Sequence, residues 1–215
     1  MIIGDTMPTV LTEGELIFQF GDKWRVCKYD DTTFYNRIKG RGIKGVDFLA
    51  VSDKSVLLME VKHITAPDEK SSMRLFYDAD IEQVERIQDK LQNECRLNRR
   101  EKNFIKVLSP RPYLADEVSK KVKDTLLGLI AGQRYNDHDL HYYHQYQNKP
   151  IIVLLFLERS KHLNEIEHFK PLASHLKITL EQQLSFLGNI HINVVNTLTI
   201  PHESAIKVYK NKYEY

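Results

Sequence analysis

The stretch from Gly45 to Lys62 constrains the fold of this chain more than any other part of the sequence. Two apolar runs, Phe48–Val51 and Val56–Met59, flank a polar turn at Ser52–Ser55, a pattern typical of a β-hairpin. With the turn centred between Asp53 and Lys54, the expected cross-strand pairs are Val51 with Val56, Leu49 with Leu58, and Asp47 with Glu60. Side chains paired in this way have Cβ atoms roughly 5 Å apart.

This expected hairpin is apolar on both faces, which indicates strands inside a sheet that is covered on both sides. Asp47, Glu60 and Lys62 share one of these faces. Two opposed carboxylates in a buried place destabilise the fold unless a cation joins them. The alternative is a charged hairpin end in solvent, but the apolar neighbours argue against it. The pattern therefore predicts a metal site.

Composition limits the class of protein without naming a function. The 215 residues suit one domain, and 31 basic against 29 acidic side chains give no overall charge that indicates nucleic acid. Cys27 and Cys95 lack metal-type spacing, which favours a reducing compartment. The N-terminal residues do not have the pattern of a signal peptide, and the run Ile151–Leu157 is too short to span a bilayer. We expect a soluble cytoplasmic protein that does not associate with membranes.

The N-terminal part predicts a second hairpin and a short helix. Leu16–Phe20 and Trp24–Tyr29 flank Gly21-Asp22, which indicates two strands joined by a tight turn. Asp30 or Asp31 is the expected cap of a helix carrying Phe34, Tyr35 and Ile38. A basic connector from Lys39 to Lys44 then leads into the Asp47 strand.

The remainder predicts alternating helices and strands. Apolar residues at Ile81, Val84, Ile87 and Leu91 have the spacing of one buried helical stripe. Further helices are expected from about 116 to 131 and from about 172 to 187, ended by Gly132 and Gly188. Strands are expected at 151–157, in the centre of the sheet, and at 190–195. This order predicts an α/β fold, with a mixed central β-sheet flanked by helices.

Asp47, Glu60 and Lys62 match the motif of the PD-(D/E)XK, or restriction-endonuclease-like, nuclease superfamily, with Val46 in place of the motif's proline. The chain resembles small bacterial members of that superfamily. The matching words are Trp24–Tyr35, Val46–Val51, Met59–Lys62 and Glu117–Leu126. The resemblance covers about the first 130 residues. It implies one nuclease-like domain over residues 1–215, with a helical insertion at about 65–109.

The constellation also predicts a chemistry. Asp47, Glu60 and the backbone carbonyl of Val61 are oxygen ligands of the kind that Mg²⁺ and Mn²⁺ prefer. Bound metal would lower the pKa of a water molecule and stabilise the charge that develops on phosphate. Lys62 would hold or activate that water, or neutralise the phosphorane. Gly45, the expected neighbour of Lys62 across the hairpin, would leave room for a phosphate backbone.

A second constellation lies on the helix expected at 116–131. Glu117, Lys121, Asp124 and Thr125 form one polar stripe, and Lys121 is a candidate to contact phosphate or to orient a metal ligand. The alternative is an ordinary solvated face with a Glu117–Lys121 pair. Lys120 and Lys123 are expected to face solvent or nucleic acid.

Two questions stay open from the sequence. Many superfamily members use one more acidic residue from the N-terminal region, and the candidates here are Glu13, Glu15, Asp30 and Asp31. The segment 134–149 contains His138, His141 and His144 at steps of three, which suggests zinc. Such steps drift around a helix and no cysteine joins them, so a polar surface loop is the expectation.

The expected function is that of a Mg²⁺-dependent nuclease that hydrolyses phosphodiester bonds. DNA is the expected substrate rather than RNA, with an endonuclease in defence, repair or mobile-element biology as the expected role. Superfamily members often dimerise, but the sequence has no coiled-coil signature and leaves a homodimer open. The alternative is a nuclease-like subunit that binds nucleic acid or a partner protein without cleaving.

Overall fold

The structure is a computed structural model that describes residues 8–64, 74, 75, 87, 90, 91, 93, 98, 101, 113–138, 140–144 and 148–210. The chain divides into two compact units, one formed by Met1–Thr65 with Val118–Tyr215 and the other by Ala66–Glu117. The insertion expected at about 65–109, and most of the helix expected around Ile81 to Leu91, lie outside the described residues and stay predictions. Two members of the predicted buried stripe are described, Ile87 and Leu91, and they are 58% and 40% exposed, so the prediction that they are buried is wrong.

The first unit is built on a five-stranded mixed sheet in the order β3-β4-β5-β6-β7. Its strands are β3 (Arg25–Lys28), β4 (Phe48–Val51), β5 (Val56–Ile64), β6 (Ile151–Arg159) and β7 (Ile190–Val195). β3, β4 and β5 are antiparallel neighbours, whereas β5, β6 and β7 run parallel. The predicted α/β class is therefore confirmed, and the apolar run at 151–157 forms an interior strand as expected.

A second, three-stranded antiparallel sheet has the order β1-β2-β8, with β1 at Thr9–Glu13, β2 at Leu16–Phe20 and β8 at Ile206–Lys210. The hairpin predicted between Leu16–Phe20 and Trp24–Tyr29 is wrong, because β2 pairs with β1 and β8 while β3 pairs with β4. The Gly21 amide donates to the carbonyl of Ala205, and the Trp24 indole donates to that of Ser204. These bonds to the C-terminal segment hold the chain where it passes from one sheet to the other.

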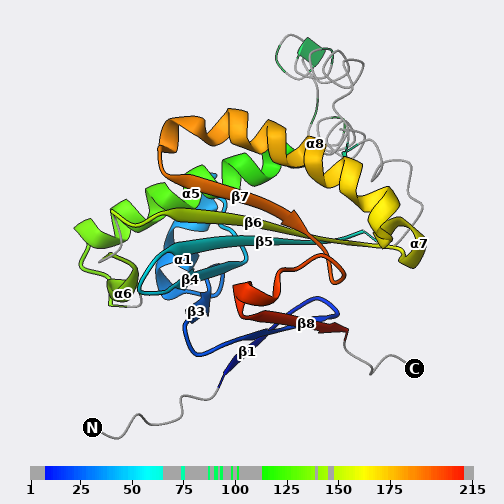
Figure 1. Cartoon of the computed structure of the whole chain (residues 1–215). Coiled ribbons are helices and arrows are strands. Elements are labelled where there is room, and N and C mark those ends of the chain that lie inside the picture. Colours follow the sequence, from blue (N-terminus) through cyan, green and yellow to red (C-terminus); the bar gives the residue numbers. More distant parts are fainter. Residues whose placement is uncertain are drawn as a thin grey trace, which may run out of the picture. The chain divides into compact units, whose positions relative to one another are not determined.

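Helices cover the face of the five-stranded sheet that lies away from the three-stranded sheet. Figure 1 shows α5 and α8 on one side of it and the three-stranded sheet on the other. The described α-helices are α1 (Thr33–Ile38), α5 (Leu114–Arg134), α6 (His141–His144), α7 (Lys161–Asn164) and α8 (Ile166–Leu184). Short 3₁₀ turns occupy η1 (Lys39–Arg41), η2 (Ser185–Leu187) and η3 (His202–Ser204).

Helix ends differ from the prediction in three places. The cap of α1 is Thr32 rather than Asp30 or Asp31, since the Thr32 hydroxyl accepts from the amide of Tyr35 at 3.2 Å. α5 continues past Gly132 to Arg134, and α8 begins at Ile166, six residues before the predicted start. The expected stop at Gly188 is confirmed, with φ of 78° following the turn that ends α8.

The core between the two sheets determines which face of the hairpin is left for the site. Phe18 packs its ring 5.2 Å from that of Phe48 and 5.1 Å from that of Phe156. Met59 and Val61 belong to the same apolar cluster. Because strand residues alternate, their neighbours Leu58, Glu60 and Lys62 are directed to the face that carries the helices.

Candidate active site

The hairpin has the predicted register, and this register brings the two carboxylates together. β4 and β5 pair Phe48 with Met59, Leu49 with Leu58, Ala50 with Leu57 and Val51 with Val56. Ser52 and Ser55 close the turn, with the Ser52 amide donating to the carbonyl of Ser55 at 2.9 Å. Asp47 immediately precedes β4, so the same register continues to Asp47 opposite Glu60.

Both carboxylates are buried. The exposed fraction is 1% for Glu60 and 8% for Asp47. One oxygen of Asp47, Oδ2, accepts a hydrogen bond of 2.6 Å from the backbone amide of Val61. This bond fastens the start of β4 to β5 and leaves Oδ1 as the Asp47 oxygen that is directed toward neighbouring side chains.

Two lysines lie against these carboxylates. The Nζ atom of Lys62 is 2.7 Å from Oε1 of Glu60. The Nζ atom of Lys121, on α5, is 2.6 Å from the same oxygen and 3.4 Å from Oδ1 of Asp47. Both side chains are less than one-fifth exposed. For Lys121, the structure therefore excludes the alternative of an ordinary solvated face.

The burial of Glu60 strongly perturbs its electrostatics. Burial, followed by the charge of Asp47, raises the pKa of its carboxyl to about 7, against the opposing effect of Lys62 and Lys121. Its second oxygen, Oε2, is buried and has no hydrogen-bond partner among the described residues. A buried acceptor without a donor is costly, and a divalent cation would satisfy it. The donor set, made of carboxylate oxygens, fits Mg²⁺ or Mn²⁺.

α5 is fastened to the segment that leads into Asp47. The amide of Lys44 donates to the Asp124 carboxylate at 2.9 Å, and the amide of Val46 donates to the Thr125 hydroxyl at 3.0 Å. These residues lie one turn along the helix from Lys121. The polar stripe predicted on this helix thus positions the backbone on the N-terminal side of Asp47.

The other α5 residues have different surroundings. Glu117 forms an ion pair with Arg74 within the second unit. The exposed Lys120 pairs with Asp124 at 2.7 Å, and the exposed Lys123 lies over the ring of Phe186. Lys120 and Lys123 therefore have the solvent exposure that the sequence predicts.

The interpretation of Gly45 as room for a phosphate backbone is wrong. A Cβ atom at Gly45 would lie 2.6 Å from Cδ1 of Tyr29 and 3.0 Å from Cε2 of Tyr35. The space beside Gly45 is therefore filled by two aromatic rings. Tyr29 also leaves no room for a side chain at Gly128. A Cβ atom at Gly128 would lie 2.1 Å from the hydroxyl oxygen of Tyr29. The sequence carries no local signal for this packing.

The N-terminal acidic residues separate into distinct environments. Glu13 pairs with Lys28 at 2.9 Å, and Glu15 lies 3.6 Å from His63. Asp30 is half-buried, and its Oδ1 has no hydrogen-bond partner in the part of the chain that the structure describes. Burial raises the pKa of the Asp30 carboxyl, and the charge of Asp47 contributes in the same direction. Asp30 is thus the N-terminal acid whose electrostatic coupling to Asp47 is resolved.

A histidine cluster that the sequence analysis missed lies where α7 meets α8. His162, Glu165 and His168 place their ligand atoms within 4.8 Å of one another, and all three side chains are exposed. Imidazole suits zinc and other transition metals rather than Mg²⁺. The signal was the spacing of three between successive residues, which also occurs at His138, His141 and His144. That second series spans the short helix α6, and the side chain of His144 lies outside the described set.

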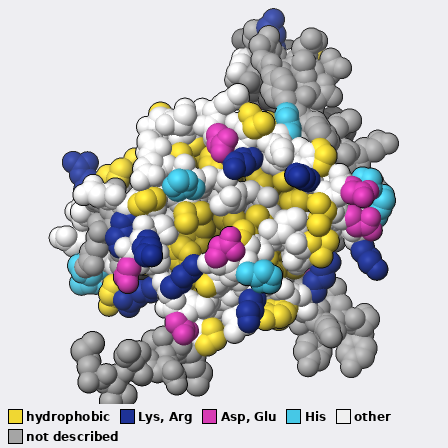
Figure 2. Space-filling model, in the orientation of Figure 1, with side chains coloured by type: hydrophobic (Ala, Val, Ile, Leu, Met, Phe, Trp, Pro, Cys, Tyr) yellow, Lys and Arg dark blue, Asp and Glu magenta, His cyan; other side chains and the backbone are white. Residues whose placement is uncertain are grey.

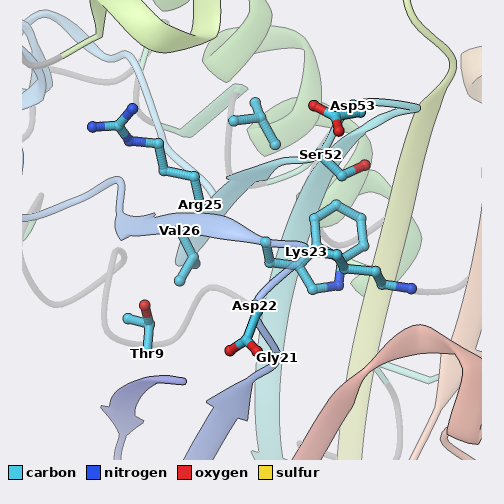
Figure 3. A pocket seen from close by; sticks show the side chains of 10 residues that line it. Thr9, Gly21, Asp22, Lys23, Arg25, Val26, Ser52 and Asp53 are labelled. Carbon is cyan, nitrogen blue, oxygen red and sulfur yellow. The ribbon is translucent and has the colours of Figure 1, made fainter. Parts of the chain in front are cut away.

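A cavity of about 520 Å³ lies at the turn end of the hairpin. Figure 3 shows the side chains that line it. Its lining includes Asp22, Lys23, Arg25, Ser52 and Asp53. Asp47 and Glu60 lie at the opposite end of the same hairpin and do not line it. The cavity therefore belongs to a different part of the surface from the carboxylate cluster.

Neither the surface of the molecule nor its comparison with known proteins indicates a function. Figure 2 shows basic, acidic and apolar side chains interspersed on one face of the molecule. Within the described part of the chain, no helix has both the length and the apolar character needed to cross a membrane. No protein-family model, curated protein or solved structure matches the chain.

Proposed function

We propose that this protein is a metal-dependent nuclease that hydrolyses phosphodiester bonds, with Asp47, Glu60 and Lys62 as its catalytic residues. One observation carries the proposal: two buried carboxylates meet beside a lysine, and Oε2 of Glu60 has no hydrogen-bond partner within the described part of the chain. An ion pair that only stabilises the fold does not require a carboxylate oxygen without a donor. A metal ligand, by contrast, needs an oxygen that is available to bind the ion.

Each residue has a role that its geometry supports. Asp47 and Glu60 would hold Mg²⁺ or Mn²⁺, together with the backbone carbonyl of Val61. The metal, when bound, would supply a water of lowered pKa and stabilise charge on the phosphate. Lys62 carries its ammonium 2.7 Å from Glu60, so it lies where it could hold the attacking water or neutralise the phosphorane.

The arrangement of elements supports a restriction-endonuclease-like fold. The Asp and the Glu-X-Lys residues lie at adjacent strands of a mixed sheet, β4 and β5. A helix, α5, and a further strand, β6, follow in the chain. This is the order that the PD-(D/E)XK superfamily implies.

A nucleic acid, DNA rather than RNA, is the substrate we propose, in a cytoplasmic role in defence, repair or mobile-element biology. The chain immediately before Asp47 carries the exposed basic residues Lys39, Arg41 and Lys44. Clustered positive charge beside a phosphodiesterase site favours a polyanionic substrate. The choice of DNA rests on the family resemblance, and a homodimer stays a prediction.

The test is cleavage of end-labelled DNA and RNA by the full chain in EDTA, Ca²⁺, Mg²⁺ or Mn²⁺. We expect cleavage in Mg²⁺ or Mn²⁺ only, and a loss of about a hundredfold or more in Asp47→Asn and Glu60→Gln. Asp53→Asn is the matched control, because this acid is exposed at the turn of the same hairpin. Equal cleavage by the parent and Asp47→Asn would exclude the proposed site.

A second function, binding without cleavage, is favoured by one observation. Lys62 and Lys121 together neutralise the two carboxylates with ion pairs of 2.7 and 2.6 Å to Glu60. Binding of labelled nucleic acid that is unaffected by chelator, with no cleavage in any metal, would support this function over the nuclease.

A further inference from the structure

The ammonium of Lys121 lies between the two candidate metal ligands. It is 2.6 Å from Oε1 of Glu60 and 3.4 Å from Oδ1 of Asp47. One ammonium therefore contacts an oxygen of each carboxylate, and it comes from α5 rather than from the strand that carries the motif lysine, Lys62.

A divalent ion shared by Asp47 and Glu60 would bind Oδ1 of Asp47, because Oδ2 accepts from the amide of Val61, and it could bind Glu60 through the unpartnered Oε2. Lys121 contacts that same Asp47 oxygen and the other oxygen of Glu60. Mg²⁺ binds oxygen at about 2.0–2.1 Å, so an ion held between the two carboxylates would leave little room for an ammonium against them. The repulsion between Lys121 and the ion adds to this steric conflict.

We propose that Lys121 is a built-in competitor of the metal: its ammonium neutralises Asp47 and Glu60 and is displaced when a divalent ion binds. This inference rests on the proposed metal-binding function. It adds a regulatory property of the same site, since metal affinity is set by an ion pair from α5.

The displacement involves the side chain rather than the helix. Asp124 and Thr125, one turn along α5, accept hydrogen bonds from the amides of Lys44 and Val46. These bonds hold the α5 backbone against the segment that precedes Asp47. The four-carbon stem of lysine, by contrast, is flexible and can carry its ammonium away from the carboxylates.

The first test is calorimetric titration of the full chain with Mg²⁺ and Ca²⁺, and these hard ions are chosen because the imidazoles of the His162 cluster favour transition metals. We expect Lys121→Met to lower the Kd by about tenfold or more, because the competing charge is gone. Lys121→Arg, which keeps the charge, should bind no more tightly than the parent. Lys123→Met removes an exposed charge from the same helix and should leave the Kd unchanged.

Thermal unfolding gives a readout that does not depend on activity. Lys121→Met should have a lower Tm than the parent in EDTA, because two buried carboxylates lose a counter-charge. The same saturating Mg²⁺ concentration should raise the Tm of the variant more than that of the parent, since the stabilisation by a ligand grows with the logarithm of its concentration divided by the Kd. Equal shifts in both proteins would overturn the inference.

A third measurement uses the unaltered protein and so does not depend on the folding of a variant. Lysine acylation, read by peptide mass spectrometry, should modify Lys121 faster in Mg²⁺ than in EDTA, while Lys123 reacts equally in both. Unchanged Lys121 labelling at saturating metal would overturn the inference.

The outcomes separate the inference from the proposed function. The inference alone is overturned if Asp47→Asn abolishes metal binding but Lys121→Met binds metal no more tightly than the parent. Tighter binding by Lys121→Met without cleavage of any nucleic acid upholds the inference and overturns the nuclease. Absence of metal binding in both proteins overturns both.

Discussion

The Lys121 ammonium lies 2.6 Å from the Glu60 carboxylate, although 61 positions separate the two residues in the chain. This ion pair joins α5 to the central strand β5 at the point where Asp47 and Glu60 meet. It makes the electrostatics of the candidate site depend on a helix as well as on the hairpin.

Replacing Glu60 by Gln should change how stability depends on pH. Because the folded pKa of Glu60 is raised from 4.5 to about 7, only the unfolded chain releases this proton between those values. The free energy of unfolding of the parent therefore falls from pH 4.5 to pH 7 by a contribution that Glu60→Gln lacks. Urea denaturation in EDTA measures the free energy of unfolding of both proteins. Between pH 4.5 and pH 7 the value for the variant should rise relative to that of the parent, by a few kcal/mol at most.

Glu203→Gln is the control for the pH experiment, because this residue is exposed on η3. Its stability should run parallel to that of the parent across the same range. Parallel curves for Glu60→Gln and the parent would contradict the raised pKa.

Thr125→Val should destabilise the protein by about 1–3 kcal/mol, since it leaves the buried amide of Val46 without its acceptor. Thr125→Ser keeps the hydroxyl and should recover much of that loss. Urea denaturation measures both. Because Val46 precedes Asp47, the cleavage rate should fall in the Val variant and less in the Ser variant. Equal stability of the two variants would show that this bond does not hold α5 in place.

Gly128→Ala should be destabilising, although alanine normally favours a helix over glycine by about 1 kcal/mol. The added methyl group would lie 2.1 Å from the hydroxyl oxygen of Tyr29, which is buried and has no hydrogen-bond partner among the residues that the structure describes. Tyr29→Phe alone should be neutral or stabilising for the same reason. In that background Gly128→Ala should cost much less, and a double-mutant cycle of thermal unfolding measures the coupling. Strict additivity would contradict this packing.

Asp30→Asn should weaken Mg²⁺ binding and cleavage by about tenfold, the range typical of groups that support a metal ligand. The physical reason is the coupling between the half-buried Asp30 carboxylate and Asp47. Asp31→Asn, at the exposed neighbouring position, is the matched control. Titration calorimetry and the labelled-DNA assay measure the two effects. The same small effect in both variants would remove Asp30 from the site.

The sequence by itself determined the local features of this protein. The polar turn at Ser52–Ser55 and the alternation of apolar residues fix the register of β4 and β5, because a shift of one residue would reverse every side chain. The same local rules predicted β6, β7 and the end of the α8 segment at Gly188. They placed Asp47, Glu60 and Lys62 on one face.

Only the tertiary structure decided the long-range features. Local pattern predicted β2 and β3 as a hairpin, but bonds from Gly21 and Trp24 to Ala205 and Ser204 hold the turn where the chain changes sheet. The contact of Lys121 with Glu60 and the filling of space beside Gly45 by Tyr29 likewise join residues from separate elements. Such contacts depend on how separate helices and strands pack against one another in the folded chain. No periodicity or turn signal in one segment specifies which distant segment it will contact.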